Sequence, residues 1–69
     1  MLKKTLVIVP TFNESGYIGK LLPKLFDLRL DVLIVDDGST DGTIEIAKSI
    51  SANGCTLKFL LRSSKLGLG

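Results

Sequence analysis

Two short apolar runs constrain the fold of this chain more than any other feature. Leu6-Val7-Ile8-Val9 is stopped by Pro10, and Val32-Leu33-Ile34-Val35 is followed at once by acidic residues. Continuous runs rich in β-branched residues are typical of strands that are buried on both faces, as in parallel sheets. A third candidate strand spans Thr56 to Leu61. These runs predict a parallel sheet.

The segments between the runs have the spacing of helices. After the first run, apolar residues recur three and four positions apart, which places them in one stripe along a helix. A second helix is expected from about Thr43 to Ala52, because Asn53-Gly54 is a good C-terminal stop. The predicted order is βαβαβ, an α/β fold in which two right-handed crossovers build a parallel sheet. The stripe of the first helix comprises Tyr17, Ile18, Leu21, Leu22, Leu25 and Leu28.

This topology makes two further predictions. Both strand-to-helix loops, 10–15 and 36–43, should lie at the carboxyl ends of the strands, where open α/β sheets bind ligands. Strands added in sequence order place both helices on one face of the sheet, and the other apolar face is then bare, which soluble domains seldom tolerate. Because of this bare face, we expect residues 1–69 to be the incomplete N-terminal part of a larger domain, or to need a partner surface.

Composition excludes several classes of protein. The 69 residues are 45% hydrophobic and 23% charged, which is globular rather than disordered. Cys55 is the single cysteine and there is no histidine, so a disulfide framework is excluded and a Cys/His zinc site nearly so; we interpret Cys55 as a small apolar residue. The net charge of +2 does not indicate nucleic acid. The first apolar run is too short for a signal peptide or a membrane span, and we expect a cytoplasmic protein.

The segment VDDGSTDGT, residues 35–43, carries three acids and two glycines after the second strand. As a calcium loop it needs a glutamate at the twelfth position, but Lys48 stands there, and a strand precedes it where a helix is required. The first strand-helix turn lacks the glycines of a dinucleotide fingerprint, and no P-loop is present. A phosphoacceptor receiver needs an acidic pair after the first strand, where this chain has Pro10 and Thr11.

After these ligand sites are set aside, the interpretation that remains is a carboxylate that recognises the N–H groups of a ligand. A rigid aspartate at a strand end can accept from uracil N3–H, or from the N1–H and N2–H₂ groups of guanine, and a site that pairs such donors discriminates against bases that lack them. The alternative is that Asp37 and Asp41 form an Asx-turn and a helix cap. For Asp41, Ser39 and Thr43 we favour this structural interpretation. Asp36 and Asp37 are adjacent acids at one strand end, and their repulsion requires compensating donors or a ligand.

Two segments together resemble the family 2 glycosyltransferases. LVIVPTFNE followed by VLIVDDGSTDGT has the order and spacing found in that family, which implies the Rossmann-like N-terminal part of the GT-A nucleotide-diphospho-sugar transferase fold. The last segment, LLRSSKLGLG, is similar to polyprenyl-phosphate sugar synthases, especially dolichyl-phosphate mannose synthases, in which an arginine and a KLGLG-like segment follow the third strand.

The resemblance implies a nucleotide-binding role for particular residues. Asp37 would bind the N–H edge of the base, Asp36 would support the loop, and Phe12 would lie against the base where the family often has tyrosine. Core packing is the alternative interpretation for both Phe12 and Tyr17. For Glu14 the alternative is a charge at a helix N-terminus, and for Lys65 it is a solvated lysine. Gly67 and Gly69 are expected to shape a turn. The implied nucleotide-binding residues are Pro10, Phe12, Glu14, Val35 and Asp37, with Asp36 and Lys65 in support.

The resemblance also implies what this chain does not contain. The family's Asp-x-Asp motif, which holds Mg²⁺ or Mn²⁺ on the donor diphosphate, is absent, so none of these residues is expected to bind metal or to be catalytic. We expect a glycosyltransferase that takes a sugar from a GDP- or UDP-sugar donor, such as mannose from GDP-mannose. The acceptor is expected to be a polyprenyl or dolichyl phosphate, or another acceptor. The expected location is the cytoplasmic membrane face. The isolated chain should be inactive. The alternative is a small non-catalytic α/β module that binds a nucleotide or a protein.

Overall fold

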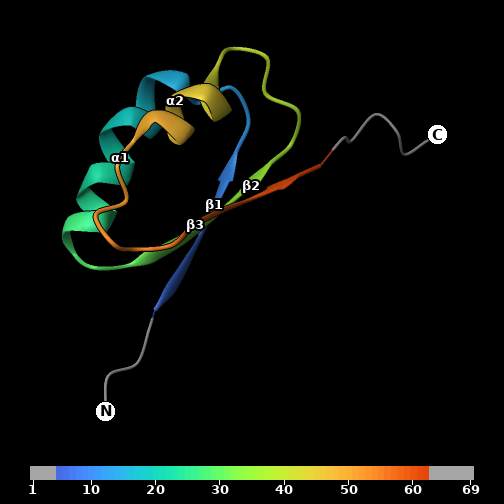
Figure 1. Ribbon diagram of the computed structural model, residues 1–69. Helices are drawn as coiled ribbons and strands as arrows, with labels where there is room; N and C mark the ends of the chain where they lie inside the picture. Colours follow the sequence, from blue (N-terminus) through green and yellow to red (C-terminus); the bar gives the residue numbers. More distant parts are fainter. Residues whose placement is uncertain (1–4, 63–69) are drawn as a thin grey trace.

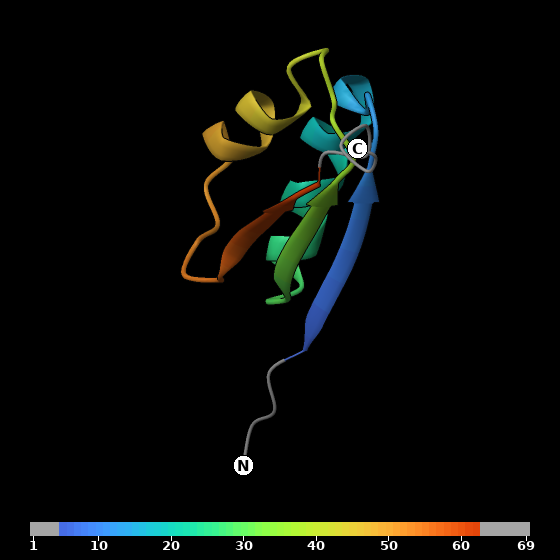
Figure 2. The same cartoon turned by 90° about the vertical axis from the view of Figure 1, so that its right-hand side faces the viewer.

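The computed structural model describes residues 5–62, and it confirms the predicted βαβαβ order. The strands form a parallel sheet in the order β1-β2-β3, with Val7 opposite Val32 and Val32 opposite Leu57. The three arrows lie side by side in Figure 2. The elements are β1 (Leu6–Thr11), α1 (Ser15–Asp27), β2 (Asp31–Asp36), α2 (Thr43–Ser49) and β3 (Leu57–Leu61).

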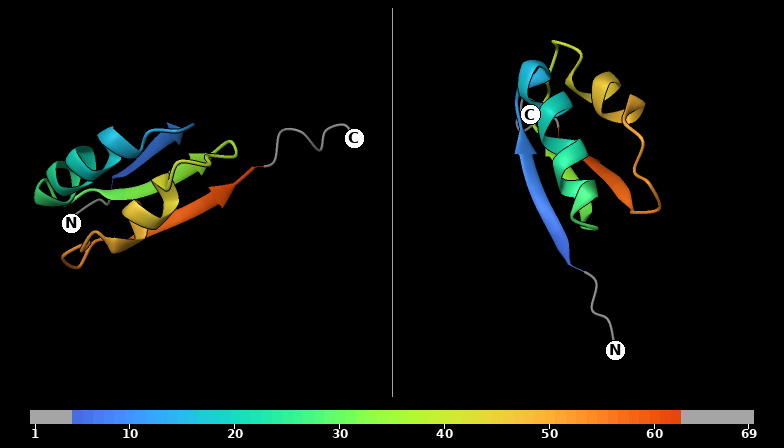
Figure 3. Two further views of the ribbon diagram at one scale, coloured as in Figure 1. Left: turned by 90° about the horizontal axis from the view of Figure 1, so that it is seen from above. Right: turned by 90° about the vertical axis from the view of Figure 1, so that its left-hand side faces the viewer.

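The molecule has two layers, a sheet and a pair of helices. Both helices lie on the same face of the sheet (Figures 1 and 3). This is the arrangement expected when two right-handed crossovers add strands in sequence order in one direction. Neither helix, within the part of the chain that the structure describes, is long and apolar enough to cross a membrane.

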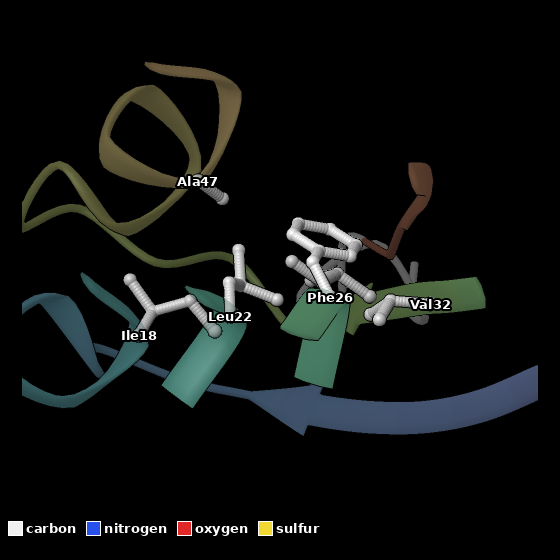
Figure 4. Close-up of a cluster of buried hydrophobic side chains, with 6 residues drawn as sticks. Ile18, Leu22, Phe26, Val32 and Ala47 are labelled. Carbon is white, nitrogen blue, oxygen red and sulfur yellow. The ribbon is translucent and has the colours of Figure 1, made fainter. Parts of the chain in front are cut away.

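The core lies between the two layers (Figure 4). Three side chains of α1 spaced four residues apart point at the sheet, and two alternate residues of β2 meet them. Ala47 closes the cluster from α2. Truncating one of the larger side chains to alanine is expected to cost about 2–5 kcal/mol, because the cavity left behind collapses only in part. The fully or almost fully buried apolar residues are Ile18, Leu22, Phe26, Val32, Ile34 and Ala47.

The buried stripe of α1 is narrower than the one predicted from spacing. Tyr17 and Leu28 are 56% and 68% exposed, so the core-packing interpretation of Tyr17 is wrong. Phe26 is buried instead, because Ile18, Leu22 and Phe26 follow one i, i+4, i+8 line along the helix, and residues away from that line fall at the rim.

Helix α2 ends at Ser49, three residues before the predicted end. Ile50 already has an extended backbone, with φ −81° and ψ 133°. The Ser49 hydroxyl donates to the carbonyl of Ile46 at 2.6 Å, and a serine bonded to its own helix in this way weakens the last turn. The reversal of the chain does occur at Asn53 and Gly54, both of which have positive φ.

The second face of the sheet is open within residues 5–62. The first strand was expected to be buried on both faces, but Leu6 and Ile8 are 55% and 60% exposed, and Leu60 of β3 is 51% exposed. Leu33 lies between Ile8 and Lys58 in the register and is half-buried. The prediction that one apolar face would be bare is therefore confirmed for the described residues.

Candidate functional site

The two strand-to-helix loops lie next to each other at the carboxyl edge of the sheet, at the top of Figure 2. One is the β1–α1 loop, residues 12–14, and the other is the β2–α2 loop, residues 37–42. Parallel pairing of β1 with β2 brings them together, because Thr11 and Asp36 are partners in the register. The pairing continues past the strands, where the Asp37 N–H donates to the Thr11 carbonyl at 3.0 Å.

Asp36 is buried and is occupied by internal hydrogen bonds. Its side chain points to the helix-covered face, as the alternation along β2 requires. Oδ1 accepts from the Thr11 hydroxyl at 2.6 Å and from the Ser39 hydroxyl at 2.5 Å. Oδ2 accepts from the N–H groups of Gly38 at 3.1 Å and Ser39 at 2.9 Å. The carboxylate thus ties the end of β1 to the turn that follows β2.

These contacts set the electrostatics of Asp36. Burial raises the pKa of its carboxyl, whereas hydrogen bonds from the Ser39 and Thr11 hydroxyls and from the Ser39 and Gly38 N–H groups lower it. The balance leaves the pKa below the ordinary value of 3.8. Because four donors favour the charged form, Asp36 is an ionised structural carboxylate at neutral pH.

Asp37 is in the opposite situation from its neighbour. Its side chain is 41% exposed, and Nε of Arg62 lies 3.0 Å from Oδ1. Oδ1 is buried, and apart from this ion pair it has no hydrogen-bond donor within residues 5–62. Asp37 is therefore a charged acceptor whose hydrogen bonds the described chain does not provide. Arg62 supplies the positive charge that offsets two adjacent acids.

The other predicted contacts surround Asp37 at the same edge. Pro10 and Val35 are register partners, and each lies two residues before a loop residue of the predicted site, Phe12 and Asp37 respectively. Phe12 follows β1 and is 58% exposed, so the core-packing alternative for this side chain is wrong. Glu14 is exposed at the start of α1, where its side chain makes no cap hydrogen bond. Apolar surface and an acceptor therefore lie at one rim.

The segment after β3 contains one contact that the sequence-based prediction did not include. Lys65, Gly67 and Gly69 lie outside the described residues. Arg62 was given no role from the sequence, although it follows β3 directly and the Arg62 N–H continues the sheet by donating to the Asp36 carbonyl at 2.7 Å. Register alone places the residues after β2 and β3 side by side, and this signal could have identified Arg62.

Asp41 connects the starts of both helices. Its Oδ1 accepts from the N–H of Thr43 at 3.1 Å and also from the Thr43 hydroxyl. Its Oδ2 accepts from the N–H of Ser15 at 3.0 Å, in the first turn of α1. The hydrogen bond from the Thr43 hydroxyl and those from Ser15 and the Thr43 N–H outweigh desolvation and lower the pKa of Asp41 to about 2. A capping role was predicted for α2, but the contact with α1 was not.

Three more hydrogen bonds join the loops. The Asn13 N–H donates to the Ser39 hydroxyl oxygen at 2.8 Å, and the Asn13 Oδ1 accepts from the Thr40 N–H at 2.8 Å. The Glu14 N–H donates to Oγ1 of Thr43 at 2.9 Å, and Thr43 is fully buried. The partners are 26 to 29 positions apart in the chain, so spacing could not have revealed them. The only sequence signal is that both loops are rich in polar residues.

The acids of this edge do not fit a divalent cation. No group of three histidine, cysteine, aspartate or glutamate side chains within residues 5–62 could hold a metal ion. Asp36 and Asp41 are turned toward protein donors, and Asp37 lies beside a guanidinium. Lys48, at the position where a calcium loop needs its glutamate, extends toward the sheet, with Nζ 5.9 Å from the centre of the Phe59 ring. Carboxylates used in this way offer no open set of oxygen ligands.

A shallow pocket lies at the other end of the molecule, away from both loops. It is lined by Phe26, Asp27, Arg29 and Asn53. Nη1 of Arg29 already donates to the carbonyl of Asn53 at 2.9 Å. The loop edge, and not this pocket, concentrates the side chains able to recognise a ligand.

Comparison with known proteins agrees with this geometry. The family model described as "Glycosyl transferase family 2" matches residues 6–69. Undecaprenyl-phosphate mannosyltransferase of Micrococcus luteus is 40% identical over 68 residues, which cover 96% of this chain and 28% of that protein. Polyprenol monophosphomannose synthase of Mycolicibacterium smegmatis is 36% identical over 70 residues, covering 97% of this chain and 26% of that protein.

A third relative has a name of a different kind. A succinoglycan biosynthesis protein of Rhizobium meliloti is 40% identical over 60 residues, covering 81% of this chain and 18% of that protein. The chain therefore spans between 18% and 28% of the length of these three relatives. No solved structure gives a significant match.

Proposed function

Since the chain belongs to glycosyl transferase family 2, we propose that it supplies the nucleotide-binding part of an enzyme that transfers a sugar from a nucleotide-sugar donor to an acceptor. The parallel βαβαβ sheet is consistent with the Rossmann-like N-terminal part of the GT-A fold. Ligands of open α/β sheets bind at the carboxyl ends of the strands. In this chain both polar loops lie at that edge.

The observation that carries the proposal is the difference in hydrogen bonding and exposure between two adjacent acids. Asp36 accepts four hydrogen bonds from within the chain, whereas Asp37 accepts no side-chain hydrogen bond from residues 5–62 and stays 41% exposed. In this proposal Asp37 accepts from a uracil N3–H or from the Watson–Crick edge of guanine. A charged acceptor so placed rejects bases that lack these donors, because its hydrogen bonds would otherwise stay unmade.

The surrounding residues complete the proposed base site. Phe12 presents an exposed ring in the neighbouring loop, and Pro10 and Val35 form an apolar pair beside Asp37. Flat apolar surface around a few placed polar groups is the usual composition of a small-molecule site. In this proposal Glu14 faces the nucleotide from the start of α1, and Lys65 has a supporting role toward its phosphates. Asp36 holds the loop that carries Asp37.

The names of two relatives support a finer proposal. We infer that the donor is GDP-mannose and the acceptor a polyprenyl phosphate, because a mannosyltransferase and a monophosphomannose synthase match nearly the whole chain. Such an acceptor would bring the complete enzyme to the cytoplasmic face of a membrane. Mg²⁺ or Mn²⁺ would neutralise the donor diphosphate as it leaves. Since the acids described here do not fit that ion, its ligands are proposed to lie in another part of the enzyme.

The rest of the domain is proposed to cover the open face of the sheet. Leu6, Ile8 and Leu60 are each more than half exposed, and the relatives are about four times as long as this chain. Burying such a face is worth roughly 25 cal/mol for each Å² of apolar surface removed from water. The 69-residue chain alone is expected to show no sugar transfer, because it lacks residues that would bind metal and acceptor.

Asp37→Ala tests the base-recognition role. In the complete transferase that contains this chain, we expect GDP or UDP to bind about 10- to 100-fold more weakly, since a hydrogen bond to a charged group is worth about 1.5–3 kcal/mol. Calorimetric titration measures this. Asp27→Ala removes an exposed acid from the far end of α1 and serves as the matched control.

Two outcomes would contradict the proposal. Unchanged nucleotide affinity in Asp37→Ala would remove the base-recognition role. Absence of any binding of GDP or UDP by the parent protein, together with capture of a protein on the open sheet face, would favour the alternative of a non-catalytic α/β binding module.

A further inference from the structure

Asn13 is the centre of a reciprocal contact between the two loops. Its main-chain N–H donates to the Ser39 hydroxyl oxygen, and its side-chain Oδ1 accepts from the Thr40 N–H, both at 2.8 Å. Asn13 adopts φ 56°, a left-handed conformation that asparagine accepts more readily than most residues. The left-handed turn is where the chain leaves β1 for α1.

Asp41 and Thr43 make a second contact behind the first. Asp41 accepts from the N–H of Ser15, and Thr43 accepts from the N–H of Glu14 at 2.9 Å. Because Thr43 is fully buried, this second contact is anchored in the fold. The outer part of the same network of hydrogen bonds between the loops consists of Asn13, Ser39 and Thr40. These residues lie at the rim that also carries Phe12 and Asp37.

Each loop carries one side of the proposed nucleotide site. Phe12 directly precedes Asn13, and Asp37 lies two residues before Ser39. Phe12 is exposed, and the Asp37 side chain is 41% exposed. The Asp37 N–H is fixed to the Thr11 carbonyl where the strands end, and beyond that point the hydrogen bonds of Asn13 join the two loops.

We propose that Asn13 is a positioning residue for the nucleotide: its side chain holds the β2–α2 loop against the β1–α1 loop and so sets the separation between Phe12 and Asp37. This inference rests on the proposed nucleotide-binding function. Asn13 does not touch the nucleotide. It acts by having the loops ordered before the ligand arrives, and ordering them on binding instead would cost affinity.

Three variants separate this role from simple loss of stability. Asn13→Gly removes the Oδ1 acceptor and keeps a residue that tolerates positive φ. Asn13→Asp retains an acceptor oxygen and also tolerates this conformation. Asn53→Gly is the matched control, because Asn53 has φ 51°, is exposed, and accepts a side-chain hydrogen bond from Ser51 at the opposite edge of the sheet.

Two measurements are made on the complete transferase. Amide hydrogen exchange at Thr40 reports the contact itself. The exchange rate is expected to rise about fivefold in Asn13→Gly, because this change corresponds to the loss of a hydrogen bond worth about 1 kcal/mol. The dissociation constant of GDP or UDP is expected to rise about 3- to 10-fold, and KM for the donor to rise with kcat unchanged. Asn13→Asp should recover both values, and Asn53→Gly should match the parent.

The outcomes are distinguishable. If the parent binds neither GDP nor UDP, the proposed function fails, and the positioning role fails with it. If the parent binds and Asn13→Gly binds equally well while exchange at Thr40 has quickened, the contact exists but does not position the nucleotide, and this inference alone is overturned. Unchanged exchange at Thr40 in Asn13→Gly would likewise overturn it, because the Oδ1 acceptor would then not hold the β2–α2 loop.

Discussion

At the scale of single residues, neighbouring positions with the same chemistry have unlike surroundings. Asp36 is the last residue of β2 and Asp37 is the first residue of the loop that follows. Asp36 turns to the helix-covered face, as alternation along the strand requires, and the hydroxyls of Thr11 and Ser39 meet it there. Asp37 is 41% exposed and lies beside Arg62. The adjacent acids are tolerated because each has its own source of positive charge or donors.

Asp41 makes the stability of the loops dependent on pH. Its pKa in the folded chain is about 2, below the ordinary value of 3.8, because of hydrogen bonds to its charged form. A lowered pKa contributes stability that is complete above the unfolded value and is lost as the pH falls toward the folded value. We therefore expect the stabilisation by Asp41 to be constant above about pH 4 and to disappear between about pH 4 and pH 2.

Urea unfolding at several pH values measures this effect. Asp41→Asn should unfold at lower urea than the parent at pH 6, and the two midpoints should converge toward pH 2. Asp36 also has a lowered pKa and is retained in this variant, so both proteins still lose stability in acid. Midpoints that differ by the same amount at pH 6 and pH 2 would contradict the assigned contacts.

At the scale of elements, two glycines have opposite backbone requirements. Gly19 lies within α1 facing α2, where an added Cβ would meet Cγ2 of Ile46 at 3.5 Å, an ordinary van der Waals contact. Gly42 directly precedes α2 and has φ 89°, with nothing within 4 Å of an added Cβ. Space is therefore available at both positions, and only the backbone conformation of Gly42 excludes other residues.

Alanine substitutions should separate these requirements. Gly19→Ala is expected to raise the free energy of unfolding by about 0.5–1 kcal/mol, because alanine loses less backbone entropy in a helix. Gly42→Ala is expected to lower it by about 1–2 kcal/mol, because a left-handed conformation strains any residue with a Cβ. Chemical denaturation of both variants is the test. A stabilised Gly42→Ala variant would show that the loop before α2 does not keep this conformation.

At the scale of the whole molecule, one apolar face has no cover among the described residues. Strand order follows sequence order, so both helices cover the same side (Figure 1). Ile8 and Leu60 are on the uncovered side and are more than half exposed. Faces of this kind are normally buried against other protein, because water is a poor solvent for apolar surface.

The isolated 69-residue chain should therefore self-associate through this face. Ile8→Lys is expected to shift the sedimentation of a concentrated sample toward monomer, because a charged side chain resists burial. Leu28→Lys is the matched control, since Leu28 is 68% exposed at the end of α1, away from the sheet. Equal self-association in the parent and Ile8→Lys, with Leu28→Lys monomeric, would place the contact elsewhere.

The order of the elements could be predicted from the sequence better than the surroundings of single residues. Apolar runs such as Val32–Val35 and the polar loops after them indicated the strands, their order and the shared edge, and the structure agrees. Phe26 and the early end of α2 were missed, because they depend on which line of a helix meets the sheet and on one serine hydroxyl. The nucleotide-binding roles of Pro10, Glu14 and Asp37 remain predictions.

The sequence by itself determined the βαβαβ order, the parallel sheet and the position of both polar loops, because hydrophobic periodicity and turn residues act locally along the chain. Only the tertiary structure decided that Asp36 is occupied by internal hydrogen bonds while Asp37 is 41% exposed beside Arg62, that Asp41 connects the starts of both helices, and that Asn13 joins the loops. The contacts of Asp41 with Ser15 and of Asn13 with Ser39 and Thr40 link residues 26 or 27 positions apart. Their partners are set by the register of β1 against β2, which exists only once the chain has folded.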